Sequence, residues 1–239
     1  MRIAKKHELL VIEDATQGVM ASYNGRALGS IGDLGAYSFH ETKNVISGEG
    51  GALAVNRVGL ISEAEIIREK GTDRSRFLRG SVDKYTWQSL GSSFLPGEII
   101  AAFLWAQLQE AQEITDKRCH LWNRYNDLFE NLENQGLVTR PHVPEQCEHN
   151  AHVFYLILAP QISRKELLDF MATKGVNAVF HYVPLHTSPA GRKFSRHSGD
   201  LTNTVNLSER LFRLPLWIGL NPAQQQIVYD SVFEGLNKQ

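Results

Sequence analysis

The alternation of apolar runs and polar residues predicts three short strands in the first quarter of the chain. Residues 9–12 form a continuous apolar run, which is typical of a strand buried on both faces, and the run ends at two acids, the second of which is Asp14. A second strand is predicted over residues 35–39, shortly before Lys43, and a third over residues 52–55. Open α/β sheets bind ligands at the carboxyl ends of their strands, so Asp14 and Lys43 mark the region where a site is expected.

Apolar residues recur at helical spacing in the rest of the chain, between segments rich in Gly, Pro and Asn. Residues 1–8 resemble the end of a helix, and Asn24-Gly25 is typical of a tight hairpin turn. The helix predicted over 99–132 is the longest, and a helix of this length often connects two lobes. The other predicted elements are helices over 60–71, 163–174 and 205–213, strands over 153–158 and 176–182, and a final helix after Asn221-Pro222.

Composition restricts the class of protein. The chain has 239 residues, of which 42% are hydrophobic and 21% charged, with a formal net charge of −1, which argues against a nucleic-acid binder and against a disordered chain. Its two cysteines, Cys119 and Cys147, fit a reducing compartment. The first apolar run is too short for a signal peptide, and no run approaches the roughly 20 residues of a membrane span. We therefore expect a cytoplasmic protein without nucleic-acid or membrane partners.

Asp14 and Lys43 together indicate a specific chemistry, although each alone has a more common structural explanation. A lone Asp after a strand often caps a turn, and a lone Lys in a Gly-rich loop is usually solvated. A carboxylate and a lysine at the ends of two strands are what a pyridoxal phosphate (PLP) site needs. The carboxylate keeps the pyridine nitrogen protonated, and the lysine amine holds the aldehyde. Ser38, five residues before Lys43, has a hydroxyl that could reach the phosphate.

Two competing motifs are weaker. The glycines of residues 48–51 do not follow the G-x-G-x-x-G pattern and precede a strand instead of opening a helix, so a dinucleotide site is not favoured. His149 and His152 lack a third metal ligand at a recognisable spacing, and a proline between His181 and His186 breaks helical geometry. We therefore expect loop or pocket histidines and no metal site.

Residues 68–84 form a basic segment with six basic and three acidic side chains. Two interpretations remain open. The segment is either a solvated loop or a rim that binds a diphosphate, because arginine forks match phosphate oxygens.

Three segments resemble the signature segments of the DegT/DnrJ/EryC/StrS sugar aminotransferases: VIEDATQG (11–18), SFHETKN (38–44) and GEGGALAVN (48–56). The resemblance extends over essentially the whole chain. It implies an α/β fold, that of the fold-type I PLP-dependent transferases, with the C-terminal half of the large PLP-binding domain over 1–115. The linking helix and a small α+β domain would occupy 116–239. It also implies a homodimer with active sites at the subunit interface.

The resemblance implies a role for each matching residue. Asp14 matches the acid that pairs with the pyridine nitrogen, and Gln17 matches the glutamine against the cofactor ring and its 3′-oxygen. Ser38 matches a phosphate contact, and Lys43 matches the Schiff-base lysine, which would also shuttle the proton. A lysine at this position argues against the dehydratase branch of the family, which has histidine there. His186 matches a position near the substrate.

The implied reaction moves an amino group from L-glutamate to the C4 keto group of dTDP-4-dehydro-6-deoxyglucose and gives dTDP-4-amino-4,6-dideoxygalactose. Residues 68–94, 104–108 and 180–191 most resemble the members that make this product. One departure concerns the partner subunit's phosphate, because many relatives read Gly-x-Asn-x-Arg-Met before the long helix. Here Ser93 replaces the Asn and can still donate a hydrogen bond, whereas Leu95 cannot replace the Arg.

Members of the family normally have roughly another third of chain before the position of residue 1. That part supplies the backbone cup for the phosphate and an aromatic ring that stacks on the cofactor. We therefore expect this chain alone to bind the cofactor weakly, to aggregate and to expose a sheet edge. Two alternatives stay open: an inactive or complementing fragment, and a nucleotide-sugar binding protein without transamination.

Overall fold

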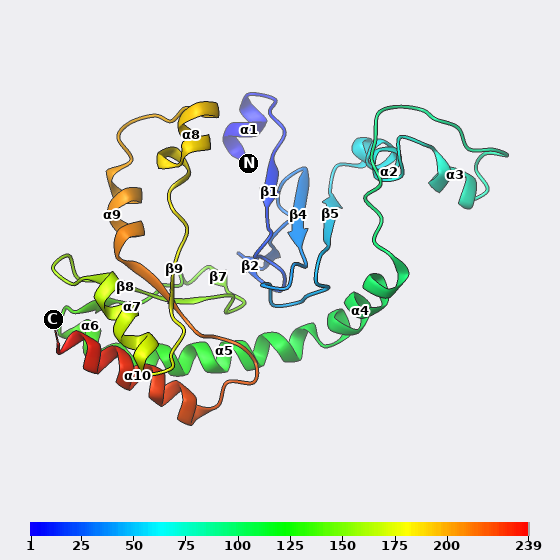
Figure 1. Ribbon diagram of the computed structural model, residues 1–239. Coiled ribbons are helices and arrows are strands. Elements are labelled where there is room, and N and C mark those ends of the chain that lie inside the picture. The colour runs from blue at the N-terminus through cyan, green and yellow to red at the C-terminus, as the bar shows by residue number, and fades with distance from the viewer. Residues whose placement is uncertain (239) are drawn as a thin grey trace. The chain divides into compact units, whose positions relative to one another are not determined.

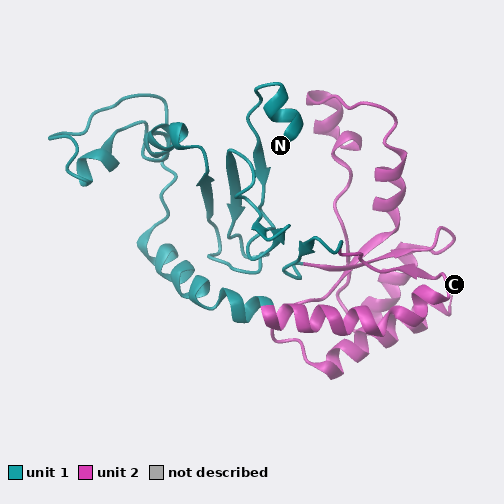
Figure 2. Ribbon diagram, turned by 180° about the vertical axis from the view of Figure 1, so that it is seen from behind, with its two compact units in different colours: residues 1–115, 144–152 teal, residues 116–143, 153–239 magenta. Residues whose placement is uncertain are grey.

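The computed structural model describes residues 1–238, which divide into two compact units (Figure 2). Unit 1 comprises residues 1–115 and 144–152, and unit 2 comprises the rest of the described chain. The sequence predicted two contiguous domains with a boundary between residues 115 and 116. The structure differs at 144–152, which returns to unit 1 because it pairs there with a short strand.

The central sheet of unit 1 has the strand order β1-β4-β5 (Figure 1), with the strands Ile12–Asp14, Leu34–Ser38 and Gly51–Val55. β1 and β4 run parallel, with Asp14 opposite Ala36, so their carboxyl ends meet at one edge of the sheet. β5 returns antiparallel, which brings Gly51 opposite Ser38. The three predicted strands are therefore confirmed as elements, and the loops that follow β1 and β4 begin side by side.

The first strand starts three residues later than predicted. The backbone N–H of Leu9 is used to close the first helix, by a 2.9 Å bond to the carbonyl of Ala4. Val11 then bonds to Asp33 instead of to a strand partner, through its N–H (2.8 Å to Oδ2) and its carbonyl. Ile12 is 67% exposed, so the prediction of a run buried on both faces is wrong for unit 1. Within the described residues β1 pairs only with β4, which leaves its outer edge open, as expected.

The predicted hairpin at Asn24-Gly25 is confirmed. β2 (Ser22–Tyr23) and β3 (Arg26–Ala27) pair antiparallel, and both turn residues have positive φ, +50° and +70°. This is the turn that matches the twist of the two strands, and Asn and Gly adopt it readily. β7 (Cys147–Glu148) adds to the other edge of β2, which anchors the returning segment.

The predicted long helix is three helices. α4 ends at Gln109, α5 spans Ala111–Leu128, and α6 begins at Glu130. Phe129, at the second break, is fully buried against the rings of Tyr125 and Phe154, so the chain turns where that ring must enter the core. α4 spans Glu98–Gln109, and α6, in unit 2, spans Glu130–Asn134. The other helices of unit 1 are α1 (Arg2–Lys6), the 3-10 helix η1 (Val58–Leu60), α2 (Ile61–Arg68) and α3 (Arg74–Leu78).

Unit 2 is built on a four-stranded sheet of order β6-β8-β10-β9. Alternate residues of β8 are fully buried, and Phe154 packs among the rings of Trp122, Tyr125 and Phe129 at 5.2–6.0 Å. The hydroxyl of Tyr125 donates to the carbonyl of Pro215 (3.0 Å), and burial raises its pKa. The strands are β6 (Val138–Thr139), β8 (Phe154–Leu158), β9 (Val179–Phe180) and β10 (Leu211–Leu214).

The helix predicted over 205–213 ends early. α9 spans Thr202–Arg210, and residues 211–214 form β10, between β8 and β9. Phe212 and Leu214 alternate into the core, and Pro215 disfavours a helical conformation at the residue before it.

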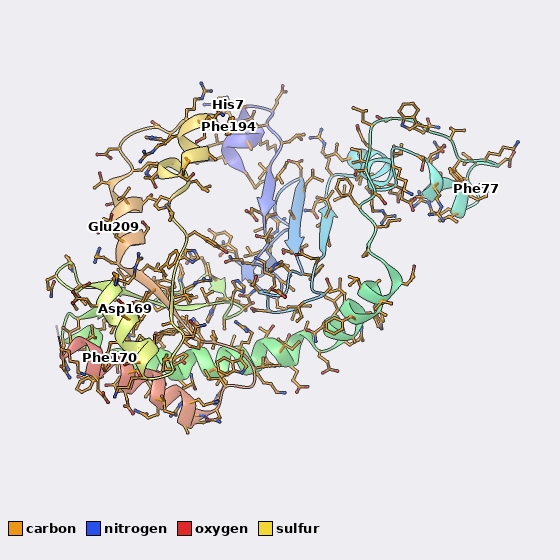
Figure 3. The ribbon with its side chains drawn as sticks, in the orientation of Figure 1. His7, Phe77, Asp169, Phe170, Phe194 and Glu209 are labelled. Atoms are coloured by element: carbon orange, nitrogen blue, oxygen red, sulfur yellow. The ribbon has the colours of Figure 1, made fainter. Side chains whose placement is uncertain are left out.

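Two helices of unit 2 begin at polar caps. The side chain of Ser163 accepts the N–H of Glu166 at the start of α7 (Arg164–Thr173), and Asn221 forms a capping box with Gln224 at the start of α10 (Pro222–Leu236). Phe170 on α7, labelled in Figure 3, lies under the ammonium groups of Lys174 and Lys238. Unit 2 also contains η2 (Leu185–Thr187) and α8 (Pro189–Phe194). Among the described residues, no helix has both the length and the apolar character needed to cross a membrane.

Replacing Phe154 by Ala is expected to lower the free energy of unfolding of unit 2 by about 3–5 kcal/mol, because a cavity would remain among three aromatic rings. Urea unfolding followed by circular dichroism measures the change. Phe194→Ala is the matched control: its ring is 77% exposed, so its effect should stay within about 0.5 kcal/mol. Equal effects of the two substitutions would contradict the assignment of Phe154 to the core.

Candidate active site

Lys43 lies in the loop that follows β4, and buried residues hold the loop on both sides. Phe39 and Val45 are 5% and 1% exposed and belong to one apolar cluster with Ala111. The N–H of Lys43 donates to the carbonyl of His40 (2.9 Å), and the N–H of Ser47 donates to that of Phe39 (2.7 Å). The lysine is therefore presented by a closed, anchored loop and not by a free one.

The two acids at the end of β1 have different environments. Successive side chains of a strand point to opposite faces, so Glu13 and Asp14 diverge. Asp14 is exposed, and its carboxylate accepts the N–H of Thr16 (3.3 Å). Hydrogen bonds from Thr16 lower the pKa of Asp14, and the positive charge of Lys43 lowers it further. Asp14 thus stays ionised and interacts favourably with the lysine.

Glu13 organises the Gly-rich loop that leads into β4. Its carboxylate accepts three backbone N–H groups, those of Gly29 (2.9 Å), Ile31 and Gly32. Partial burial raises the pKa of Glu13, but the three N–H bonds together lower it below its ordinary value. Glu13 is therefore a structural acid, and only Asp14 of the pair lies on the side of the lysine.

A small pocket brings together three of the predicted site residues: Gln17, Ser38 and Lys43. Gln17 comes from the loop after β1, and Ser38 is the last residue of β4. The hydroxyl of Ser38 accepts the N–H of His40 (3.3 Å). The pocket is lined by Thr16, Gln17, Val19, Ser38, Lys43, Asn44, Val45, Asn150 and His152.

Among the pocket residues that were not predicted as site residues, three are hydrogen-bonded to one another: Asn44, Asn150 and His152. Asn150 is buried and donates through Nδ2 to the carbonyls of Gln17 and Val19, at 2.7 Å each. The sequence shows His152 only as half of a weak metal pair, and nothing in the local pattern indicates that 144–152 returns to unit 1. The only available signal was the SFHETKN segment, which contains Asn44 next to the lysine.

Three predicted site residues do not line this pocket. Asp14 ends β1 outside the lining and interacts with Lys43 through its charge. Ser93 is exposed and forms a backbone bridge with Glu69, outside the pocket lining. His186 belongs to unit 2, where its ring lies edge-on to that of His197, with 5.2 Å between centroids. Neither Ser93 nor His186 is among the residues that line the pocket.

Two arginines of the basic segment 68–84 pair with acidic side chains of unit 1. Arg79 makes a two-pronged contact with Glu65 (2.6 Å to each oxygen), and Arg74 lies 3.6 Å from Glu69. A guanidinium fork that binds a carboxylate in this way is not presented to a phosphate. These two arginines favour the solvated-loop interpretation over the diphosphate rim.

A larger apolar groove of about 760 Å³ lies between β5 and α2 in unit 1. Leu53 and Phe94 line it, together with Pro96. It does not contain the acid and lysine at the strand ends, so its size does not make it the site of chemistry.

The residues of the small pocket fit PLP. Lys43 offers an amine for an aldehyde, Ser38 a hydroxyl for a phosphate oxygen, and Gln17 an amide for a ring oxygen. Asp14 is ionised, as an acid opposite a pyridinium nitrogen must be. The pocket therefore offers an amine that can react with an aldehyde and a hydroxyl that can bind an anionic group.

Comparison with known proteins identifies relatives along almost the whole chain. The model of the DegT/DnrJ/EryC1/StrS aminotransferase family matches residues 1–233. The chain is 32% identical over 236 residues to a pleiotropic regulatory protein of Geobacillus stearothermophilus, covering 97% of this chain and 59% of that protein. It is 31% identical over 193 residues to the GDP-perosamine synthase of Caulobacter vibrioides, covering 79% and 49%. The chain thus spans about half to three fifths of the length of these relatives.

The solved structure of S. venezuelae DesV in complex with a ketimine intermediate is similar to this chain, with 26% identity and a TM-score of 0.83, covering 98% of this chain and 60% of that one. The structural neighbours are sugar aminotransferases of fold type I, so the predicted fold class is confirmed. The sugars named for the relatives carry different nucleotides, GDP in one case and UDP or dTDP in others. The comparisons therefore show the family, and the reaction and its sugar are left to be proposed.

Replacing Glu13 by Gln is expected to lower the free energy of unfolding at pH 7 by about 1–3 kcal/mol, because three N–H groups lose a charged acceptor. The pKa of Glu13 is below its ordinary value of 4.5 in the folded chain. Its contribution is therefore complete above pH 4.5 and is lost as the pH falls through the folded pKa. Urea unfolding at a series of pH values should show wild type and variant converging in acid.

Glu63→Gln, an exposed position on α2, is the control and should leave the stability nearly unchanged at every pH. A difference between wild type and Glu13→Gln that does not depend on pH would contradict the role given to the ionised carboxylate.

Proposed function

Because the chain belongs to the DegT/DnrJ/EryC1/StrS aminotransferase family, we propose that it carries the lysine-bearing part of a PLP-dependent sugar aminotransferase site. The observation that carries this proposal is the meeting of Gln17, Ser38 and Lys43 in one pocket, at the ends of two parallel strands. When bound, PLP supplies an electron sink that allows an amino group to leave one carbon and join another.

Each residue has a defined task in this proposal. Lys43 holds the aldehyde carbon of the cofactor and, once its amine is released, moves a proton between the α-carbon of the amino donor and the cofactor. Asp14 keeps the pyridine nitrogen protonated, and its lowered pKa supports this task. Gln17 contacts the ring and its 3′-oxygen, and the hydroxyl of Ser38 donates to the phosphate.

The amino donor is L-glutamate, and the acceptor is the C4 keto group of dTDP-4-dehydro-6-deoxyglucose, which becomes dTDP-4-amino-4,6-dideoxygalactose. The support is the resemblance of residues 68–94, 104–108 and 180–191 to the members that make this sugar, and the occurrence of dTDP-sugar transaminases among the relatives. His186, in the 180–191 segment, lies near the sugar in this proposal.

The working form is a homodimer in which Ser93 donates a hydrogen bond to the phosphate in the partner subunit. The exposed apolar side chains of α4 support a second copy at this surface: Ile99, Phe103 and Trp105 are 86%, 50% and 67% exposed. None of the residues of α4, all of which the structure describes, is buried. Such a surface is typical of an interface between subunits.

Incubation with PLP followed by borohydride reduction should attach the cofactor covalently to Lys43, and mass spectrometry of the digested chain locates the adduct. The reaction traps even weakly bound cofactor, so it applies to the 239-residue chain by itself. Lys43→Arg should reduce the adduct at this position to the background, because the guanidinium is a poor nucleophile at neutral pH. Lys84→Arg, in the basic segment, is the control and should leave the yield unchanged.

Formation of the dTDP-amino sugar is then measured with L-glutamate and dTDP-4-dehydro-6-deoxyglucose, in parallel with the UDP-linked analogue. Glutamate-dependent amine formation that is lost in Lys43→Arg supports the proposal. An adduct spread over surface lysines contradicts the cofactor site. Binding of the nucleotide sugar without amine formation favours a binding protein instead.

A further inference from the structure

Asn150 connects the two loops of the pocket, through its side-chain amide to the first loop and through its backbone carbonyl to the second. It is 6% exposed, and Nδ2 donates to the carbonyls of Gln17 and Val19, both in the loop after β1. Its backbone carbonyl accepts Nδ2 of Asn44, in the loop after β4, at 2.7 Å. Loops that follow neighbouring parallel strands are thus joined through a third segment, which comes from residues 144–152.

The orientation of Asn44 is fixed by a further bond. Because Nδ2 of Asn44 donates to Asn150, its Oδ1 faces Nδ1 of His152 (3.0 Å) as the acceptor. His152 therefore carries a proton on Nδ1, an assignment that follows from the hydrogen-bond network. The N–H of His152 in turn donates to Oδ1 of Asn150 (3.2 Å). A closed network of this kind, with both amides satisfied, holds its members rigidly.

The backbone between these residues is in a strained conformation. Ala151 has a φ of +50°, in the left-handed region that costs a non-glycine residue roughly 1–2 kcal/mol. It is 1% exposed, and its N–H lies 3.3 Å from Nδ1 of His149. Such strain persists where the surroundings hold it in place, and it is concentrated at functional sites. Here it allows Asn150 and His152 to reach the pocket together.

We propose that Asn150 is a positioning residue for the cofactor pocket: it fixes the loop that carries Gln17 relative to the loop that carries Lys43. The role in positioning a cofactor rests on the proposed function, whereas the connection of the two loops does not. Asn150 acts through the two loops, by the carbonyls of Gln17 and Val19 and the amide of Asn44. Displacements of about 1 Å at a reacting group cost about 100-fold in rate, so a link of this kind determines whether the lysine and the glutamine act on the same ring.

The test uses Asn150→Asp, which keeps the shape and Oδ1 but sets an oxygen against the two carbonyls. Asn56→Asp is the matched control, because Nδ2 of Asn56 also donates to two loop carbonyls, those of Gly29 (2.9 Å) and Gly32 (3.1 Å), outside the pocket lining. Asn150→Ala removes the same bonds without adding a charge and serves if Asn150→Asp does not fold.

The first measurement is amide hydrogen exchange of the 239-residue chain without PLP, read over residues 15–20 and 42–46. Both Asn150 variants should exchange at least about tenfold faster over 15–20, because local opening no longer has to break the two side-chain bonds. The same increase is expected over 42–46, because the backbone carbonyl that accepts Asn44 is then no longer anchored to the first loop. Asn56→Asp should leave both segments within about twofold of wild type. Unchanged exchange over 42–46 would overturn the inference, since Asn150 would then be an anchor of the first loop only.

The second measurement is the yield of the borohydride-reduced PLP adduct at Lys43. The Asn150 variants should lose at least about tenfold in yield at the same PLP concentration, while Asn56→Asp keeps the wild-type yield even if its overall stability falls. If Asn56→Asp loses as much adduct yield as the Asn150 variants, Asn150 contributes only to general stability and the inference is wrong. If wild type itself forms no adduct at Lys43, the proposed function fails, and the exchange result alone decides whether Asn150 couples the loops.

Discussion

The hydrogen bonds of Asn150 are the constraint on which the organisation of unit 1 depends. The sheet itself specifies only where β1 and β4 end, because two parallel strands bring their carboxyl ends to the same edge. It does not determine the paths of the loops that follow. Buried apolar residues such as Phe39 and Val45 hold the second loop down, but they do not relate it to the first. That relation comes from Asn150, whose side-chain amide donates to the first loop and whose backbone carbonyl accepts Asn44 of the second. The residues of the pocket therefore come from three parts of the chain, and the last is the most distant in sequence.

The two acids at the end of β1 have different roles, one in the fold and one beside the lysine. Glu13 accepts the N–H groups of a loop whose glycines allow a close approach, so its charge is used for structure. Asp14, one residue on and therefore on the other face, keeps its charge for the side where Lys43 lies. Neighbouring carboxylates in a sequence are easily taken for a catalytic pair, but in a strand the alternation of side chains separates them.

Most of unit 1 could be predicted from the sequence because its signals are local. The Asn24-Gly25 turn, the apolar strand residues and the acid and lysine after them depend on neighbours in the chain. The break at Phe129 and the start of β10 at Leu211 could not be predicted, because tertiary packing decides them. Phe129 packs in an aromatic cluster, and β10 pairs between two other strands. The same holds for Asn150, whose partners are set by where a distant segment returns. Asp14, Ser38 and Lys43 were predicted as site residues from their chemistry and from a family resemblance, and Gln17 from the resemblance alone.

The separation along the chain between Asn150 and its partners has a consequence for how the pocket is made. The bond to Gln17 closes a loop of 133 residues, and loop closure of this length is slow and entropically costly, by about 4 kcal/mol on a random-chain estimate. During synthesis at about 5–20 residues per second, Asn150 leaves the ribosome roughly 5–20 s after Lys43. For that interval the lysine amine lies in a loop that nothing yet aligns. The pocket is thus organised only after the chain has turned back on itself, so its formation reports the closure of unit 1.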